Sequence, residues 1–130
     1  MSTMIDTSVA IPLLLANHPD HAQVASWATG KRLTFAGHAI FETYAVLTRL
    51  PVDSRLTPQQ AQQLIGQYDA SEPLGLASQE AIRLMATHNI TGGQVYDALI
   101  GLACQDQALA TRDQRAIELY RKLGVEVEIV

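Results

Sequence analysis

The sequence predicts an α/β fold, an α/β/α sandwich in which helices cover both faces of a mostly parallel sheet of about five strands. Short runs of strand-forming residues alternate along the chain with helical stretches of about ten residues, the pattern of βαβ units. The length of 130 residues suits one domain, residues 1–130, which buries roughly two-thirds of its unfolded surface.

The expected strands are short apolar or β-branched runs bounded by polar or turn-forming residues. They lie at Met4-Ile5 and over residues 33–36, 74–77, 108–111 and 125–130. Strands this short, separated by helices, favour parallel pairing, because each connection has to cross back to the same edge of the sheet.

The expected helices fill the intervals between these strands. They cover residues 8–16, 20–28, 38–50, 57–68, 78–89, 94–104 and 113–123. Thr57 and Pro58 suit the N-cap and first turn of one helix. Pro51 follows the end of another, and Gly124 suits the stop of the last.

Composition excludes several classes of protein. The hydrophobic fraction of 48% and the charged fraction of 17% indicate a compact chain and not a disordered one. No apolar stretch approaches the roughly 20 residues that span a bilayer, and the first residues lack the basic charge of a signal peptide. The single cysteine, Cys104, excludes an internal disulfide and suits a cytoplasmic location.

Four acidic residues stand where an acid has little structural reason to be. Asp6 and Asp113 follow expected strands, and ligands bind beyond the carboxyl ends of strands in parallel sheets. Asp97 lies inside an otherwise apolar helix, and Glu42 lies in another. Acids from distant parts of a chain commonly converge on a hard divalent cation, and such clusters catalyse phosphodiester chemistry.

Each acid also has an ordinary structural explanation. Asp6 and Asp113 each precede a helix and are suitable N-caps, although a cap uses only one carboxylate oxygen and leaves the other available. Glu42 could be a surface residue paired with Arg49, which lies about two helical turns away on the same face. Asp97 could be a first-turn acid stabilised by the helix dipole.

The net charge of -4 is unusual for a protein that handles nucleic acid. Removing the four candidate ligands from the 13 acids leaves nine, which equals the nine lysines and arginines. The rest of the molecule is therefore neutral. The acidic balance argues against loose binding to long duplexes, and only weakly against a nucleic-acid substrate.

The segments that carry the four acids also follow a family pattern. They are Met4-Ile5-Asp6-Thr7-Ser8, residues 41–50 beginning Phe41-Glu42-Thr43-Tyr44, Tyr96-Asp97-Ala98-Leu99-Ile100 and Ala110-Thr111-Arg112-Asp113. In this order and spacing they resemble PIN-domain ribonucleases, specifically the VapC-type toxins of toxin–antitoxin pairs. With the closing strand near Val125, the resemblance covers essentially the whole chain.

The resemblance implies a PIN-like fold and an endoribonuclease that depends on Mg²⁺, with Mn²⁺ as a substitute. It implies a structured RNA substrate such as tRNA or ribosomal RNA, with no membrane association. It further implies a homodimer and a small DNA-binding antitoxin that occupies the active site. Cleavage by an activated water in line with the leaving oxygen would give a 5′-phosphate and a 3′-hydroxyl.

The resemblance also assigns roles to individual residues. Asp6, Glu42, Asp97 and Asp113 become the catalytic, metal-binding acids, and Ser8 and Thr111 become their hydroxyl supports. Some relatives carry a further acid two residues after the fourth, where this chain has Arg115. Because they flank Asp113, Arg112 and Arg115 are candidates for contacts with substrate phosphates, with surface salt bridges as the ordinary alternative.

Two other functions fit an α/β chain of this kind. A phosphate-transfer protein of the receiver or haloacid-dehalogenase type also uses an aspartate at a strand end, but Asp6-Thr7-Ser8 lacks the second acid that such a phosphatase uses. A receiver needs a late lysine at a strand end, and neither Lys31 nor Lys122 is placed for that role. A catalytically inactive PIN-like module that binds RNA or a partner protein is the second alternative.

Overall fold

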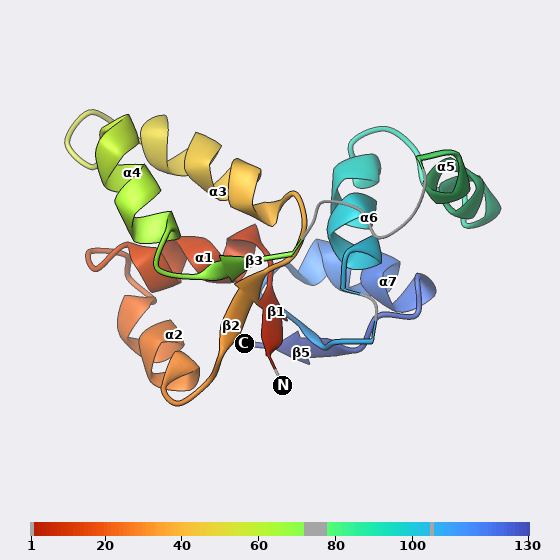
Figure 1. The fold of residues 1–130 in the computed structure, drawn as a ribbon, viewed down its shortest axis with the longest axis horizontal. Coiled ribbons are helices and arrows are strands. Elements are labelled where there is room, and N and C mark those ends of the chain that lie inside the picture. Colours follow the sequence, from red (N-terminus) through yellow and green to blue (C-terminus); the bar gives the residue numbers. More distant parts are fainter. Residues whose placement is uncertain (1, 72–77, 105) are drawn as a thin grey trace.

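A computed structural model describes residues 2–71, 78–104 and 106–130 and contains a five-stranded, entirely parallel sheet (Figure 1). Its strands are β1 (Thr3–Ile5), β2 (Leu33–Phe35), β3 (Asp69–Ala70), β4 (Leu109–Thr111) and β5 (Val127–Ile129). The strand order is β3-β2-β1-β4-β5. The expected α/β sheet is confirmed, although the expected strand over 74–77 lies outside the described residues and β3 was not expected.

Seven helices in the described residues surround the sheet. They are α1 (Thr7–Leu14), α2 (His21–Ala28), α3 (Ala39–Thr48), α4 (Pro58–Ile65), α5 (Ser78–Thr87), α6 (Gln94–Leu102) and α7 (Gln114–Lys122). Figure 1 shows α1 to α4 gathered on one side of the central strands and α5 to α7 on the other. Each helix matches an expected one, and the observed bounds are mostly shorter than the expected ones.

The α4 helix shows how a cap sets such a bound. The Thr57 hydroxyl accepts a hydrogen bond from the Gln60 amide, and the Gln60 side chain accepts one from the Thr57 amide. This capping box satisfies two amide groups that the first turn of a helix otherwise leaves unpaired. At its other end α4 stops at Gly66, before the expected end near residue 68.

One hydrophobic core joins the sheet to its helices. Ile5 of β1, Ala110 of β4 and Val9 of α1 are fully buried, as are Phe35 of β2 and Leu47 of α3. Strands buried on both faces read as continuous apolar runs, which is why these segments were recognisable in the sequence. No helix in the described part of the chain combines the length and apolar character needed to cross a membrane.

The strand order determines where a ligand site can form. From β1 the chain crosses to β2 on one side, whereas β4 pairs with β1 on the other. The sheet therefore has its switch point at the carboxyl ends of β1 and β4, the place where parallel α/β sheets bind ligands. Asp6 follows β1 directly, and Asp113 lies two residues beyond β4. In Figure 1, α3 and α6 stand on either side of this point.

Candidate active site: an acidic pocket at the switch point

The four expected acids line one pocket at the carboxyl ends of β1 and β4. The pocket has a volume of about 60 Å³ and is lined by Asp6, Thr7, Ser8, Glu42, Asp97, Ile100, Asp113 and Tyr120. We call it the acidic pocket. Its acids come from the end of β1, the first turn of α3, the first turn of α6 and the N-cap of α7.

Asp6 is the most constrained of the four acids and is only 3% exposed. Its Oδ1 accepts hydrogen bonds from the Ser8 amide at 3.0 Å and the Ser8 hydroxyl at 2.6 Å. Its Oδ2 accepts from the Thr111 hydroxyl at 2.5 Å and the Tyr120 hydroxyl at 3.1 Å. A carboxylate held by four donors from three elements has a single orientation.

Burial raises the pKa of Asp6 above its ordinary value, because a charged carboxylate loses its hydration in the interior. Hydrogen bonds from Ser8, Thr111 and Tyr120 oppose this shift by stabilising the ionised form. Asp6 also caps α1 through the Ser8 amide. The N-cap explanation and a site role are therefore compatible at this residue.

Glu42 and Asp97 face the pocket from α3 and α6. Burial raises the pKa of Glu42, and the negative charges of Asp97 and Asp6 raise it further. Burial likewise raises the pKa of Asp97, assisted by Asp113 and Asp6 and opposed by Arg115. These mutual effects show that the carboxylates are close enough to repel one another.

Glu42 carries an oxygen that the protein does not satisfy. Its Oε1 is buried and has no hydrogen-bond partner among the described residues. A buried carboxylate oxygen without a donor is unfavourable, and such a group in a folded protein commonly marks a ligand or ion position. The expected alternative, a surface pair with Arg49, does not occur.

Asp113 both caps helix α7 and lines the acidic pocket. Its Oδ1 accepts from the Arg115 amide at 3.0 Å and caps α7. Its own amide donates to the Thr111 hydroxyl at 3.0 Å. Thr111 thus holds Asp6 through its hydroxyl proton and Asp113 through its hydroxyl oxygen.

Ser8 and Thr111, the expected supports, join the two strand ends into one hydrogen-bonded network. Their hydroxyl oxygens lie 3.2 Å apart, and the Arg112 amide donates to the Ser8 hydroxyl at 2.7 Å. Each hydroxyl contacts Asp6 directly. The network ties the start of α1 to the segment between β4 and α7.

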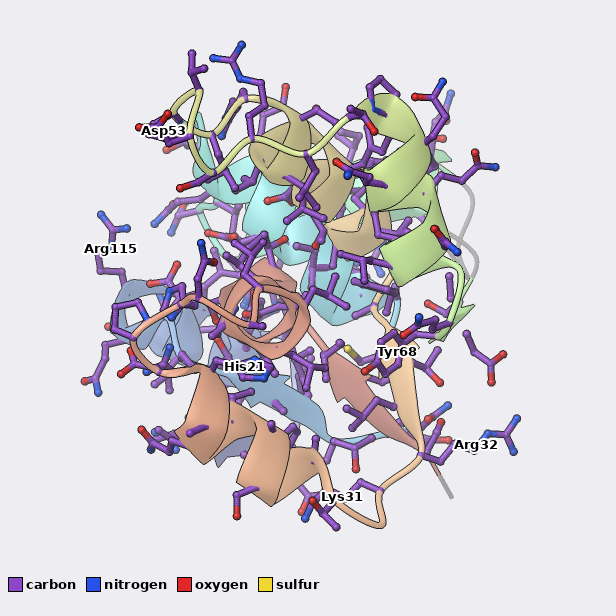
Figure 2. The ribbon with its side chains drawn as sticks, turned by 90° about the vertical axis from the view of Figure 1, so that its left-hand side faces the viewer. His21, Lys31, Arg32, Asp53, Tyr68 and Arg115 are labelled. Carbon is purple, nitrogen blue, oxygen red and sulfur yellow. The ribbon has the colours of Figure 1, made fainter. Side chains whose placement is uncertain are left out.

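The two expected phosphate contacts lie differently. The Arg112 guanidinium donates to Asp20 Oδ2 at 2.8 Å, which ties the β4 end to the start of α2, and it does not line the acidic pocket. The Arg115 side chain is 95% exposed, with Nε 3.6 Å from Asp113 Oδ1. Figure 2 shows Arg115 projecting into solvent, so it is the one of the two that an RNA strand could reach.

Thr7, Ile100 and Tyr120 also line the acidic pocket and were not predicted from the sequence, and of these Tyr120 contacts Asp6 through its side chain. It is fully buried on α7, and burial together with the charge of Asp6 raises the pKa of its hydroxyl. Its ring belongs to the apolar face of α7, with Ala116, Ile117 and Leu119. The available signal was its position seven residues after Asp113, which places both on one helix face.

The pocket fits a divalent cation by donor type and by location. Carboxylate and hydroxyl oxygens are the donors that hard cations take, and the unpartnered Glu42 Oε1 provides one of them. Among the described residues, no group of three or more His, Cys, Asp or Glu side chains is arranged to hold a metal as it stands. A bound cation would offset the repulsion between these carboxylates.

Comparison with known proteins agrees with this geometry. The protein-family model described as PIN domain matches residues 3–122. The chain belongs to the PIN domain family. It is 48% identical over 130 residues to Ribonuclease VapC27 of Mycobacterium tuberculosis strain H37Rv, covering 96% of this chain and 94% of that protein. It is 38% identical to Ribonuclease VapC40 of strain CDC 1551, covering 96% of each.

The resemblance seen in the sequence is therefore confirmed. This PIN domain places the four acid-bearing segments at one end of its sheet, although they are up to 107 positions apart along the chain between Asp6 and Asp113. The matched region begins at the first residue of β1 and ends at the last residue of α7. It thus includes every residue of the acidic pocket.

Proposed function

We propose that this chain is a VapC-type toxin, a metal-dependent endoribonuclease that hydrolyses phosphodiester bonds in structured RNA such as tRNA or ribosomal RNA. The observation that carries the proposal is the convergence of Asp6, Glu42, Asp97 and Asp113 on one pocket at the switch point of the sheet. Membership of the PIN domain family and similarity to proteins named ribonucleases support it.

The proposed cofactor is Mg²⁺, with Mn²⁺ as a substitute. When bound, such a cation activates water at neutral pH and neutralises charge on a phosphodiester. Asp6 provides a rigid carboxylate because four hydrogen bonds fix its orientation. Glu42 from α3 and Asp97 from α6 would offer carboxylate oxygens to the cation from opposite sides. Asp113 contributes from the N-cap of α7.

The remaining residues of the site hold the acids in position or contact the substrate. Ser8 and Thr111 hold Asp6 in place through their hydroxyl groups and favour its ionised form. Arg115 can reach a phosphate of the RNA strand, since its guanidinium is exposed at the rim of the pocket. Arg112 contributes structurally by pairing with Asp20.

The decisive experiment compares RNA cleavage by wild type and Asp97→Ala with Mg²⁺ or Mn²⁺, and then with EDTA. Wild type should cleave RNA to leave 5′-phosphate ends, and EDTA should stop the reaction. The variant should lose more than the ~10- to 100-fold that removal of an outer-shell group costs. Asp53→Ala is the matched control, since Asp53 is an exposed acid outside the acidic pocket (Figure 2).

Three outcomes would redirect the proposal. Metal binding without cleavage of total tRNA or ribosomal RNA indicates a narrower substrate, which a transcriptome-wide search for new 5′-phosphate ends then identifies. Absence of both metal binding and cleavage indicates the alternative, a PIN-like module that binds RNA or a partner without catalysis. Equal activity of Asp97→Ala and wild type removes Asp97 from the site.

The proposed protein partner is a small DNA-binding antitoxin. An apolar groove of about 490 Å³ between α3 and α4, lined by Ile40, Phe41, Tyr44 and Ile65 among others, supports this proposal. Phe41 is 61% exposed and Tyr44 is 40% exposed. Phe41 precedes Glu42, so an antitoxin segment seated in the groove would reach the acidic pocket. Phe41→Asp should abolish inhibition by the proposed antitoxin, while cleavage persists.

The proposed assembly is a homodimer. Ile82 on α5 and Tyr96 on α6 are exposed apolar side chains on the side of the molecule opposite α4, and such side chains are common at subunit contacts. Sedimentation equilibrium of the purified chain tests this assembly, and a monomer at all concentrations contradicts it. Ile82→Asp should shift the equilibrium toward monomer.

A further inference from the structure

A second polar pocket shares α7 with the acidic pocket. It has a volume of about 110 Å³, well above the ~10–15 Å³ that admits one water. It lies where the end of α5, the start of α6 and one face of α7 meet, and is lined by His88, Asn89, Ile90, Gln94, Arg115, Glu118, Leu119 and Lys122. We call it the basic pocket.

The side chains that line the basic pocket are mostly hydrogen-bond donors. The Arg115 guanidinium and the Lys122 ammonium carry positive charge, and the Asn89 and Gln94 amides each provide an NH₂ group. Glu118 is the one acid in the lining. The lining is therefore net positive in a chain whose formal charge is -4, and this donor set suits an anion with several acceptor oxygens.

The spacing on α7 explains how the charges gather. Arg115, Glu118, Leu119 and Lys122 are separated by three, four and seven positions, so they form one stripe along the helix. Lys122 has no hydrogen bond or ion pair with any described side chain, whereas Arg83 pairs with Glu80. Its charge is thus available to a ligand.

Arg115 connects the two pockets. Its backbone amide donates to Asp113, which lines the acidic pocket, and its side chain lines the basic pocket. Its charge also acts on Asp97, where it lowers the pKa against the effect of burial. A chain of phosphates that leaves the acidic pocket on this side moves from repelling carboxylates to attracting cations.

We propose that the basic pocket binds a backbone phosphate of the RNA, beside the phosphodiester that the acidic pocket holds. This inference rests on the proposed function, because it assumes that an RNA strand enters the acidic pocket. Contacts with phosphates position a nucleic acid without reading its sequence. The basic pocket therefore adds affinity and sets the direction of the strand, and it leaves base selection to other surfaces.

The test measures binding of fluorescently labelled total tRNA in the Asp97→Asn background, with Mg²⁺ present and over a series of salt concentrations. Lys122→Gln should weaken binding about 5- to 8-fold near 0.1 M salt, since one phosphate contact contributes about 0.7 to the salt slope in a single strand and about 0.9 in duplex DNA. The slope itself should fall by that amount. Arg121→Gln is the control, because Arg121 is an exposed neighbour on α7 outside the pocket.

A second variant tests the same pocket by gain of binding. Glu118→Gln removes the one acid from the lining and should tighten tRNA binding several-fold, a result that misfolding cannot produce. Glu126→Gln removes an exposed acid outside the pocket and should change binding by less than about twofold. Circular dichroism melting of each variant confirms that the fold is kept.

The outcomes separate this inference from the proposed function. Equal weakening by Lys122→Gln and Arg121→Gln indicates a general charge effect and overturns the basic pocket as a site, as does no effect of Lys122→Gln or of Glu118→Gln. If wild type fails to cleave RNA while Lys122→Gln still weakens tRNA binding selectively, the nuclease proposal fails and the RNA-binding pocket remains.

Discussion

Asp6 shows how single residues determine the acidic pocket. A buried carboxylate is unfavourable unless donors satisfy it, and here both oxygens accept two hydrogen bonds each. Three of the donor groups are local to the two strand ends, from Ser8 and Thr111. The fourth comes from Tyr120, which adds a contact between the start and the end of the chain.

Tyr120→Phe should weaken Mg²⁺ binding about 10-fold while the fold persists. The variant removes the hydroxyl from Asp6 Oδ2 and keeps the buried ring, so the pKa of Asp6 rises further and protons compete better with the cation. Isothermal titration calorimetry with Mg²⁺ and Mn²⁺ measures the effect at fixed pH.

Tyr68→Phe is the control for this variant. The Tyr68 ring packs edge-on against Phe35, 6.3 Å between ring centres, and does not line the acidic pocket. Its loss of a hydroxyl should leave Mg²⁺ affinity unchanged. Unaltered affinity in Tyr120→Phe would show that Ser8 and Thr111 suffice to hold Asp6.

Close packing between helices α6 and α7 holds Tyr120 against Asp6. Gly101 of α6 lies against α7, and an added Cβ would stand 3.2 Å from Tyr120 Cδ1 and 3.3 Å from Leu123 Cδ1. The glycine therefore permits the close approach that places Tyr120 against Asp6 and Asp97 beside Asp113. A larger residue requires the two helices to separate or Tyr120 to move.

Gly101→Ala should destabilise the protein by about 1 kcal/mol and weaken metal binding. Alanine improves helix propensity by about 0.8–1.0 kcal/mol, but overpacking costs about 1–3 kcal/mol, so the steric effect prevails. Urea unfolding measures the stability, and the same calorimetric titration measures the metal affinity.

Gly93→Ala provides the comparison on the same helix. A Cβ at Gly93 meets nothing within 4 Å, so its effect on stability should stay within about 0.5 kcal/mol. A Gly101→Ala variant as stable as wild type, with unchanged metal affinity, would falsify the close-packing role of Gly101.

Burial of the carboxylates in the acidic pocket, together with repulsion between them, affects the stability of the whole molecule. The pKa values of Asp6, Glu42 and Asp97 are raised in the folded state, so the folded chain binds more protons than the unfolded chain in a window above the ordinary carboxyl values near pH 4. Without metal, the free energy of unfolding therefore decreases as pH rises through that window and increases again as pH is lowered.

In EDTA, the melting temperature should therefore increase as the pH is lowered from about 7 toward about 5. Saturating Mg²⁺ should weaken or reverse this trend, because the cation replaces the protons. Asp97→Asn should melt higher than wild type at neutral pH in EDTA and should show a smaller pH dependence. Scanning calorimetry from about pH 5 to about pH 7 measures these melting temperatures. A metal-free melting temperature that increases with pH contradicts the prediction.

Cys104 gives a separate measure of global opening. It is fully buried in the turn after α6, its thiol donates to the Ile100 carbonyl, and burial raises its pKa to about 12. At pH 8 only about one thiol in ten thousand is ionised in the folded protein, so a disulfide reagent should label it only in urea. Rapid labelling of the native protein would contradict this burial.

Much of the fold could be predicted from the sequence, because its signals are local. Buried parallel strands read as apolar runs, caps such as Thr57 with Gln60 mark helix starts, and the four acids stand out against apolar surroundings. The short strand β3 was not predicted, since Asp69 and Ala70 are both exposed and carry no apolar pattern.

The sequence by itself determined the α/β class, the alternation of helices with four of the five strands, and which four acids line the acidic pocket, because each depends on residue type and short spacing. Only the tertiary structure decided which donors surround Asp6, that Arg112 pairs with Asp20 while Arg115 stays exposed, and that Lys122 lines a second pocket. The physical reason is that hydrogen bonds and charges act over a few ångströms in space, whereas the residues that they join are up to 114 positions apart in the chain.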